Sequence, residues 1–79
     1  EQDMRDIKAS LIIANILSQA LITLAPRIIN LAAKGATLVL SGILVGEINN
    51  VVEAYAPHFK VVSAKTQDEW ARLELRSRE

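Results

Sequence analysis

Cysteine is absent from this 79-residue chain, which excludes disulfide bonds and thiolate metal sites. An excess of either charge is absent as well, since nine basic residues balance nine acidic ones. A neutral balance does not favour nucleic acid or an anionic membrane as a partner recognised by bulk charge. The lack of cysteine is compatible with a reducing compartment.

A long uninterrupted apolar run is also missing. Residues 9–26 carry no charge and approach the length of a membrane span, but polar side chains interrupt them and Pro26 closes the stretch. These polar groups would need hydrogen-bond partners inside a bilayer, which disfavours a membrane-spanning segment. The chain begins with Glu1, without an initiator methionine or a signal-like segment. The expected molecule is a soluble chain without a membrane partner.

Glycine is scarce, and its placement excludes a common cofactor motif. The three glycines, Gly35, Gly42 and Gly46, are too far apart to form a Gly-x-Gly-x-x-Gly loop between a strand and a helix. The sequence therefore lacks the glycine-rich loop that holds a dinucleotide or a related cofactor.

What is present indicates one small globular unit. The composition is 51% hydrophobic and 23% charged, which is typical of a folded domain. Residues 1–8 are polar and predict a loop. Residues 10–17 and 36–44 are apolar on both alternating faces, a pattern typical of strands buried on both faces of a parallel sheet.

Helices are expected after each of these strands. Ser18 offers an N-cap hydroxyl for the first helix, and Pro26 predicts a kink or two abutting helices. Lys34 and Gly35 resemble a helix end. A second helix is expected over residues 46–56, and Pro57 ends it.

The last third predicts a hairpin. Residues 59–64 and 70–76 are two extended runs separated by a polar stretch, and the second run alternates apolar with charged side chains. One buried face and one solvent-exposed face are typical of an antiparallel edge or near-edge strand. The predicted fold class is α/β, with the order strand–helix–strand–helix–strand–strand and a terminal antiparallel hairpin.

Several stretches of the chain are distinctive in their order and spacing. They are 14–17 (ANIL), 24–26 (LAP), 38–44 (LVLSGIL), 55–59 (YAPHF) and Trp70. Together they resemble the bacterial methyltransferases that modify large-subunit ribosomal protein eleven (the PrmA-type family), and the resemblance spans about residues 9–76.

This resemblance implies half of a Rossmann-like class I methyltransferase sheet. In that family the strands corresponding to this chain are the fourth to the seventh, and their spatial order is four, five, seven, six. Residues 1–79 would then be a single partial domain, the carboxyl-terminal half, without the glycine-rich cofactor half. The implied function is S-adenosylmethionine-dependent methylation of amines of a ribosomal protein in the cytoplasm, with the fragment alone inactive.

The resemblance also implies a site at the carboxyl ends of the parallel strands. Asn15 would contact the cofactor and orient the acceptor amine, with the backbone carbonyls of Ile16 and Leu17 nearby. Many amino-methyltransferases have Pro-Pro where this chain has Ile-Leu. Ser41 and Gly42, at the same sheet edge, are candidates for substrate contact. The structural alternatives are that Asn15 satisfies a turn and that Gly42 forms a bend.

Other chemistry has little support in the sequence. His58 is the single histidine and is expected in a surface loop rather than at a metal. Trp70 fits the core better than a substrate pocket. No spacing suggests a nucleophilic triad or paired catalytic carboxylates.

A second hypothesis assigns the chain no catalysis. It would be a structural or engineered half-domain that self-associates, because residues 10–17 form a long, apolar and uncharged strand that would have an unpaired edge. If the chain is a complete polypeptide, this hypothesis predicts a homo-oligomer.

Overall fold

The computed structural model describes residues 8–79. Most of the loop predicted over residues 1–8 therefore lies outside the described residues. Within them, four strands form one sheet in the order β1-β2-β4-β3. The elements in chain order are β1 (Ala9–Asn15), α1 (Ser18–Thr23), α2 (Ala25–Leu31), β2 (Ala32–Leu44), the short 3-10 helix η2 (Val45–Glu47), α3 (Ile48–Tyr55), β3 (Phe59–Gln67) and β4 (Trp70–Ser77).

The sheet is mixed. β1 and β2 are parallel, as the intervening helical crossover requires, whereas β4 is antiparallel to both β2 and β3. β4 follows β3 through a tight turn at Asp68, which adopts a positive φ of 55°. The predicted hairpin and the predicted spatial order of the four strands are both confirmed.

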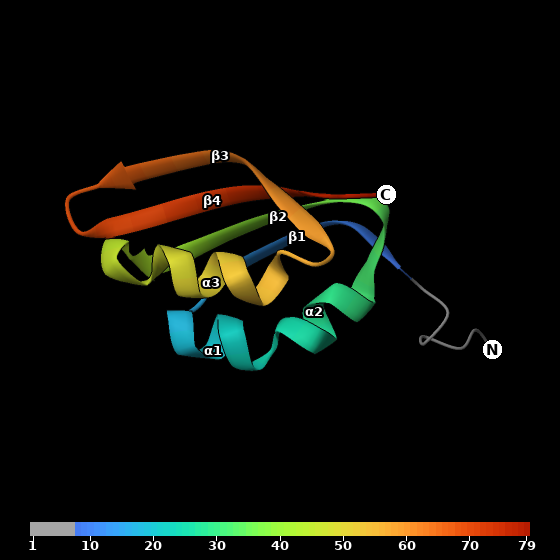
Figure 1. Cartoon of the computed structure of the whole chain (residues 1–79), viewed down its shortest axis with the longest axis horizontal. Helices are drawn as coiled ribbons and strands as arrows, with labels where there is room; N and C mark the ends of the chain where they lie inside the picture. The colour runs from blue at the N-terminus through green and yellow to red at the C-terminus, as the bar shows by residue number, and fades with distance from the viewer. Residues whose placement is uncertain (1–7) are drawn as a thin grey trace.

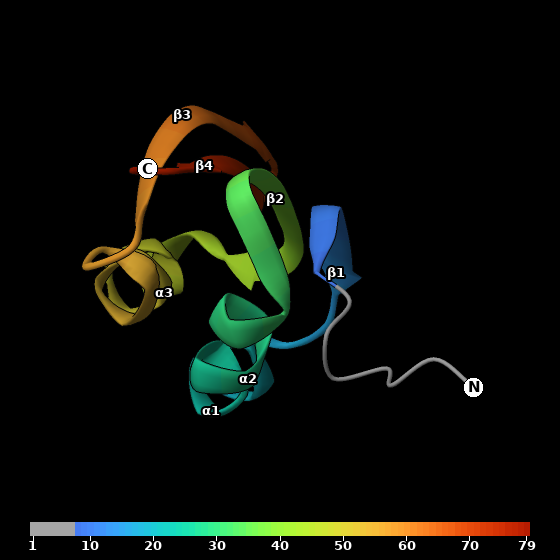
Figure 2. The same cartoon turned by 90° about the vertical axis from the view of Figure 1, so that its right-hand side faces the viewer.

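The three α-helices lie on one side of the sheet, and no element of residues 8–79 covers the other side (Figures 1 and 2). The core sits between the helices and the sheet. Its members are apolar side chains from every layer: Leu21, Ala25, Ile28, Ala36, Leu38, Leu40, Ile43, Val51, Tyr55, Phe59, Ala71, Leu73 and Leu75.

Alternation on β4 follows the predicted pattern. Ala71, Leu73 and Leu75 are buried against the helices, and Arg72 and Arg76 are exposed on the helix-free face. Since strand side chains alternate between faces, the period-two pattern places one apolar row in the core.

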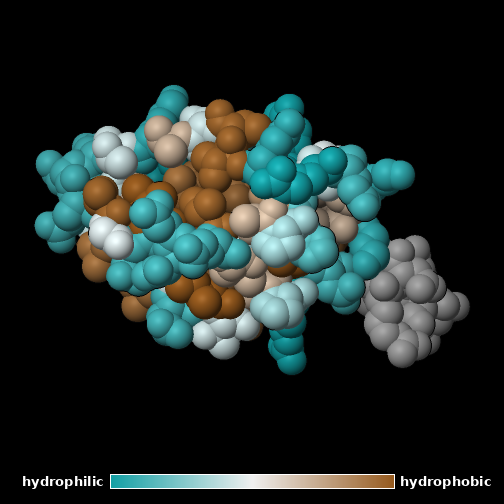
Figure 3. All heavy atoms as spheres, viewed as in Figure 1, coloured by the Kyte–Doolittle hydropathy of each residue, from teal (hydrophilic) through white to brown (hydrophobic). Residues whose placement is uncertain are grey.

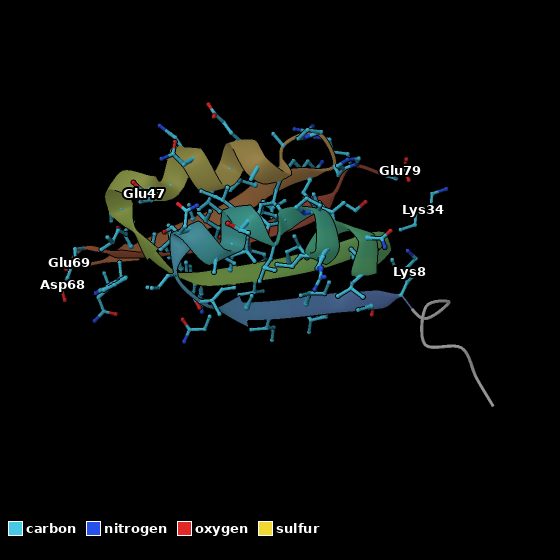
Figure 4. The ribbon with its side chains drawn as sticks, turned by 90° about the horizontal axis from the view of Figure 1, so that it is seen from below. Lys8, Lys34, Glu47, Asp68, Glu69 and Glu79 are labelled. Atoms are coloured by element: carbon cyan, nitrogen blue, oxygen red, sulfur yellow. The ribbon has the colours of Figure 1, made fainter. Side chains whose placement is uncertain are left out.

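The prediction that the first strand is buried on both faces is wrong. Leu11 and Ile13 are 55% and 68% exposed, and β1 contains no buried residue. β1 is an edge strand, and seen from the helix side it lies beside α1 and α2 rather than beneath them (Figure 4). The strand also ends at Asn15, two residues before the predicted end.

The helical crossover differs from the prediction at both ends. Leu17, not Ser18, is the N-cap of α1, and no side chain caps this helix. α2 ends at Leu31, so Gly35, with a φ of 78°, lies inside β2 rather than at a helix end. The predicted break near Pro26 is confirmed, because α1 ends at Thr23 and α2 begins one residue before the proline.

A buried hydrogen bond joins two of the helices. The Tyr55 hydroxyl on α3 donates to the backbone carbonyl of Leu21 on α1 at 2.8 Å. Burial raises the pKa of Tyr55 to about 12, because the phenolate would lose its hydration. This contact fixes the two helices that cover the middle of the sheet.

Candidate functional site

An open hollow of about 560 Å³ lies where the parallel strands end. Its lining consists of Asn15, Ile16, Leu17, Ser41, Gly42 and Trp70. Asn15 is the last residue of β1 and pairs with Ser41 of β2. The structure thus brings the five predicted site residues together at the carboxyl edge of the sheet, where ligands bind in open α/β sheets.

Gly42 is required by the close approach of the turn that follows β1. Its φ is 82°, and a Cβ on this residue would lie 2.9 Å from Asn15 Oδ1 and 3.0 Å from the Ile16 carbonyl oxygen. The first distance is shorter than real Cβ contacts, and the second is tighter than most of them. The glycine therefore lets two hydrogen-bond acceptors from the β1 turn face the same point of β2.

Gly42 also belongs to a β-bulge. Ser41 and Gly42 lie between the paired positions Leu40–Leu73 and Ile43–Ala71, so two residues of β2 oppose the single residue Arg72 of β4. Such a bulge bends the strand and reorients its side chains. The bulge and the close approach of the β1 turn thus coincide at Gly42, whereas contact of Gly42 with a substrate stays a prediction.

The Leu17 carbonyl takes part in the hydrogen bonding of the first helix. It accepts the backbone N–H of Leu21 at 3.0 Å and so begins the hydrogen bonding of α1. The Leu17 side chain is 69% exposed beside the hollow. The acceptors of this turn that form no hydrogen bond within residues 8–79 are Asn15 Oδ1 and the Ile16 carbonyl.

Trp70 belongs to the hollow rather than to the core, contrary to the prediction. It is 44% exposed and pairs with Leu44 on one side and Gln67 on the other. Its position next to the polar hairpin turn is the sequence signal that could have indicated this, since the first residue of a hairpin strand lies at the end of the sheet.

His58 is exposed in the turn just before β3 and does not line the hollow; its backbone N–H donates to the Tyr55 carbonyl at 3.1 Å. The predicted surface loop is confirmed for this residue. Within residues 8–79, no three His, Cys, Asp or Glu side chains are placed to hold a metal ion. The same residues include no helix of the length and apolarity needed to cross a bilayer.

The residues that line the hollow offer few kinds of functional group. They offer an amide oxygen, a backbone carbonyl, a hydroxyl and an indole, with no carboxylate, imidazole or cation. Such acceptors suit an N–H donor, which they orient without proton transfer. These lining residues include no side-chain base that could activate the Ser41 hydroxyl.

The model of the ribosomal protein L11 methyltransferase family (PrmA) matches residues 1–78. The chain belongs to this family. Among its relatives, the ribosomal protein L11 methyltransferase of Marinobacter nauticus is 44% identical over 68 residues, which are 86% of this chain and 23% of that protein. The corresponding protein of Pseudomonas fluorescens strain Pf0-1 is 36% identical over 77 residues, or 98% of this chain and 26% of that protein. The chain thus spans about a quarter of the length of these relatives.

Solved structures share the fold. The ribosomal protein L11 methylase of Lactobacillus delbrueckii subsp. bulgaricus superposes with a TM-score of 0.86 at 25% identity, covering 94% of this chain and 39% of that one. The HpyAVI–SAM complex superposes with a TM-score of 0.76 at 14% identity, over 94% of this chain and 47% of that one. The predicted fold, part of a Rossmann-like methyltransferase sheet, is confirmed.

Proposed function

We propose that this chain is the carboxyl-terminal part of the catalytic domain of a protein N-methyltransferase that uses S-adenosylmethionine, and that it is inactive alone. The observation that carries the proposal is the pair of acceptors, Asn15 Oδ1 and the Ile16 carbonyl, held against Gly42 at the carboxyl edge of a methyltransferase sheet. The family match and the share of the relatives that the chain spans support it.

The residues of the hollow fit a cationic cofactor. Oxygen acceptors and the Trp70 indole line it, and no lysine or arginine does. An aromatic face and oxygen atoms both favour a nearby positive charge. S-adenosylmethionine would supply an electrophilic methyl group on a sulfonium, and we propose that Asn15 contacts it.

The role of the protein in methyl transfer is alignment. We propose that Asn15 Oδ1 accepts an N–H of the neutral acceptor amine, with the Ile16 carbonyl and then the Leu17 carbonyl near the same nitrogen. This contact would direct the nitrogen lone pair towards the methyl carbon. With S-adenosylmethionine bound, the new N–C bond would form as the S–C bond breaks, and the sulfur would keep the electron pair. The nitrogen would then lose a proton to water, because the lining contains no basic side chain. Ser41 and Gly42 would border the incoming substrate.

The proposed substrate is a ribosomal protein, and the acceptor is a lysine side chain or an α-amino group. This proposal extends to the present chain the function for which its relatives are named. It places the reaction in the bacterial cytoplasm, where ribosomal proteins are assembled.

A chimaera tests the proposal. In the Marinobacter nauticus relative, the matching 68-residue stretch would be replaced by the corresponding stretch of this chain. Mass spectrometry would then follow methyl groups on ribosomal protein L11. We expect methylated product that depends on added S-adenosylmethionine. A chimaera that folds, judged by circular dichroism, but transfers no methyl group would contradict the proposal.

The isolated chain has its own test. Calorimetric titration of the 79-residue polypeptide with S-adenosylmethionine should show no binding in the micromolar range, because the chain lacks a glycine-rich loop. Micromolar binding would contradict the part of the proposal that makes the isolated piece inactive, and methyl-transfer assays on the piece would follow.

For the same isolated chain we propose self-association, the second hypothesis drawn from the sequence. β1 is an edge strand, and its Leu11 and Ile13 side chains are more than half exposed. An unpaired, uncharged edge readily pairs with another strand. Apolar side chains are also visible in the middle of the face shown in Figure 3, bordered by hydrophilic ones. Sedimentation at tens of micromolar should reveal a dimer or a larger species, and a compact stable monomer would contradict this.

A further inference from the structure

A second hollow adjoins the candidate site. Its volume is about 440 Å³, and it shares Ser41, Gly42 and Trp70 with the first. Its other lining residues come from the hairpin and include the cations Lys65 and Arg72. The two hollows therefore border the same three residues, between the end of β1 and the end of the hairpin.

Strand register explains why the cations lie beside the candidate site. Asn15 pairs with Ser41, Arg72 lies opposite the Ser41–Gly42 bulge, and Arg72 pairs with Lys65. The four positions form one row across the sheet. Because paired residues of neighbouring strands point to the same face, Lys65 and Arg72 point to the helix-free face.

Within residues 8–79, neither Lys65 nor Arg72 forms an ion pair. The ion pair found there joins Arg76 to Glu74 at 3.7 Å. Asp68 and Glu69 lie beyond them, at the turn of the hairpin (Figure 4). The carboxylates at the turn would repel an approaching anion, and the two cations next to the turn would attract it. Like charges on directly paired strand positions are unfavourable without an anion between them.

We propose that Lys65 and Arg72 bind an acidic side chain of the protein substrate while its target amine occupies the hollow at Asn15. This subsite rests on the proposed methyltransferase function and adds to it a rule for choosing the substrate. Trp70 lines both hollows and would provide an apolar surface for the intervening residues of the substrate.

The row also sets the spacing of the two recognised groups. Neighbouring strands lie about 4.8 Å apart, so Arg72 and Lys65 are about 10 and 14 Å from Asn15 across the sheet. An extended peptide advances about 3.3 Å per residue. The acidic residue is therefore expected about three to four positions from the residue that carries the amine.

Trp70 makes binding directly observable, because it is the single tryptophan of the chain and lines both hollows. The experiment titrates the 79-residue chain with a short peptide containing a lysine and a glutamate four positions away, and follows indole fluorescence. A second peptide carries glutamine in place of the glutamate. We expect about three- to tenfold weaker binding of the glutamine peptide, and a smaller difference at high salt.

A matched control exists on the same face of the sheet. Lys60 and Arg76 are another lysine–arginine pair across β3 and β4, at the opposite end of the hairpin. The double variant Lys65→Gln/Arg72→Gln should abolish the discrimination between the two peptides, whereas Lys60→Gln/Arg76→Gln, with the same loss of charge, should keep it. Equal affinity of the unsubstituted chain for both peptides, or equal loss in both variants, would overturn the subsite.

The chimaera provides a second measurement that does not depend on the isolated chain folding. There, Lys65→Gln/Arg72→Gln should raise KM for the glutamate peptide about three- to tenfold with little change in kcat and in KM for S-adenosylmethionine. An effect on KM for the cofactor alone would assign the pair to the carboxylate of S-adenosylmethionine and overturn the proposal. Peptide discrimination without any methyl transfer would instead contradict the proposed function and leave the subsite standing.

Discussion

The two faces of the sheet are built from alternate residues of the same strands, yet they have opposite characters. On the helix-covered face, Leu38, Leu40, Leu73 and Leu75 are fully buried. On the helix-free face, the neighbouring positions of β1 and β4 are exposed or only partly buried. The covered face thus holds the core of residues 8–79, whereas the other face of the sheet has no helix of these residues packed on it.

Removing a leucine from the covered face tests this division most strongly. Leu73→Ala should lower the free energy of unfolding by about 2–5 kcal/mol, because a fully buried side chain leaves a cavity. Arg72→Ala, one position away on the free face, should change it by less than about 0.5 kcal/mol. Urea denaturation of both variants measures the difference, and similar losses would remove the distinction between the faces.

At the carboxyl edge, a glycine should matter for a steric reason. Gly42→Ala places a methyl group 2.9 Å from Asn15 Oδ1 at a positive φ, and should cost about 1–3 kcal/mol. Gly46→Ala is the matched control, since a Cβ there meets no atom within 4 Å. Thermal melting compares the two, and a Gly42 variant as stable as the Gly46 variant would show that the turn after β1 is not held against β2.

Within the covered layer, Tyr55 links pH to stability. Tyr55→Phe should cost about 0.5–1.5 kcal/mol through the lost hydrogen bond to Leu21. The raised pKa, about 12 in the folded chain against 10.0 for the ordinary group, means that the folded state holds the proton more tightly. Its contribution is complete below pH 10 and is lost as the pH rises towards 12. Denaturation between pH 9 and 12 should show this loss in the unsubstituted chain, and a phenylalanine variant with the same pH dependence would refute the assignment.

The free edge should show the smallest effect on intrinsic stability. Ile13→Ser removes an exposed apolar side chain and should change the unfolding free energy of a monomer by less than about 0.5 kcal/mol. It should nevertheless shift the solution mass of the isolated chain towards the monomer. Val62→Ser, on the other edge strand, is the control. Unchanged association in the Ile13 variant would exclude β1 as the contact.

The predictable parts of this molecule are those with a local physical cause. Alternation in β4 predicts its two faces, and Pro26 predicts the break between α1 and α2. The resemblance, and not a local pattern, indicated the residues that line the hollow at Asn15 and Gly42. The resemblance supplied the roles of these residues, which stay predictions.

The parts that could not be predicted depend on distant partners. Residues 10–17 are apolar on both faces, but the pattern does not reveal that all three helices of residues 8–79 lie on one side and leave Leu11 and Ile13 exposed. The position of Trp70 could not be predicted either, because an aromatic residue at the start of a strand can lie in the core or at the exposed end of the sheet. The Lys65–Arg72 pair depends on strand register, which composition alone does not define.

The most direct test of the central claim, that the carboxyl edge at Asn15 positions the acceptor amine, is the methyl-transfer rate of the chimaera with Asn15→Ala. The account predicts a fall in kcat of about 100-fold, because the amine is misplaced, while Asn49→Ala, on the exposed side of α3, transfers methyl groups at the unsubstituted rate. Equal rates for the two folded variants would contradict the account.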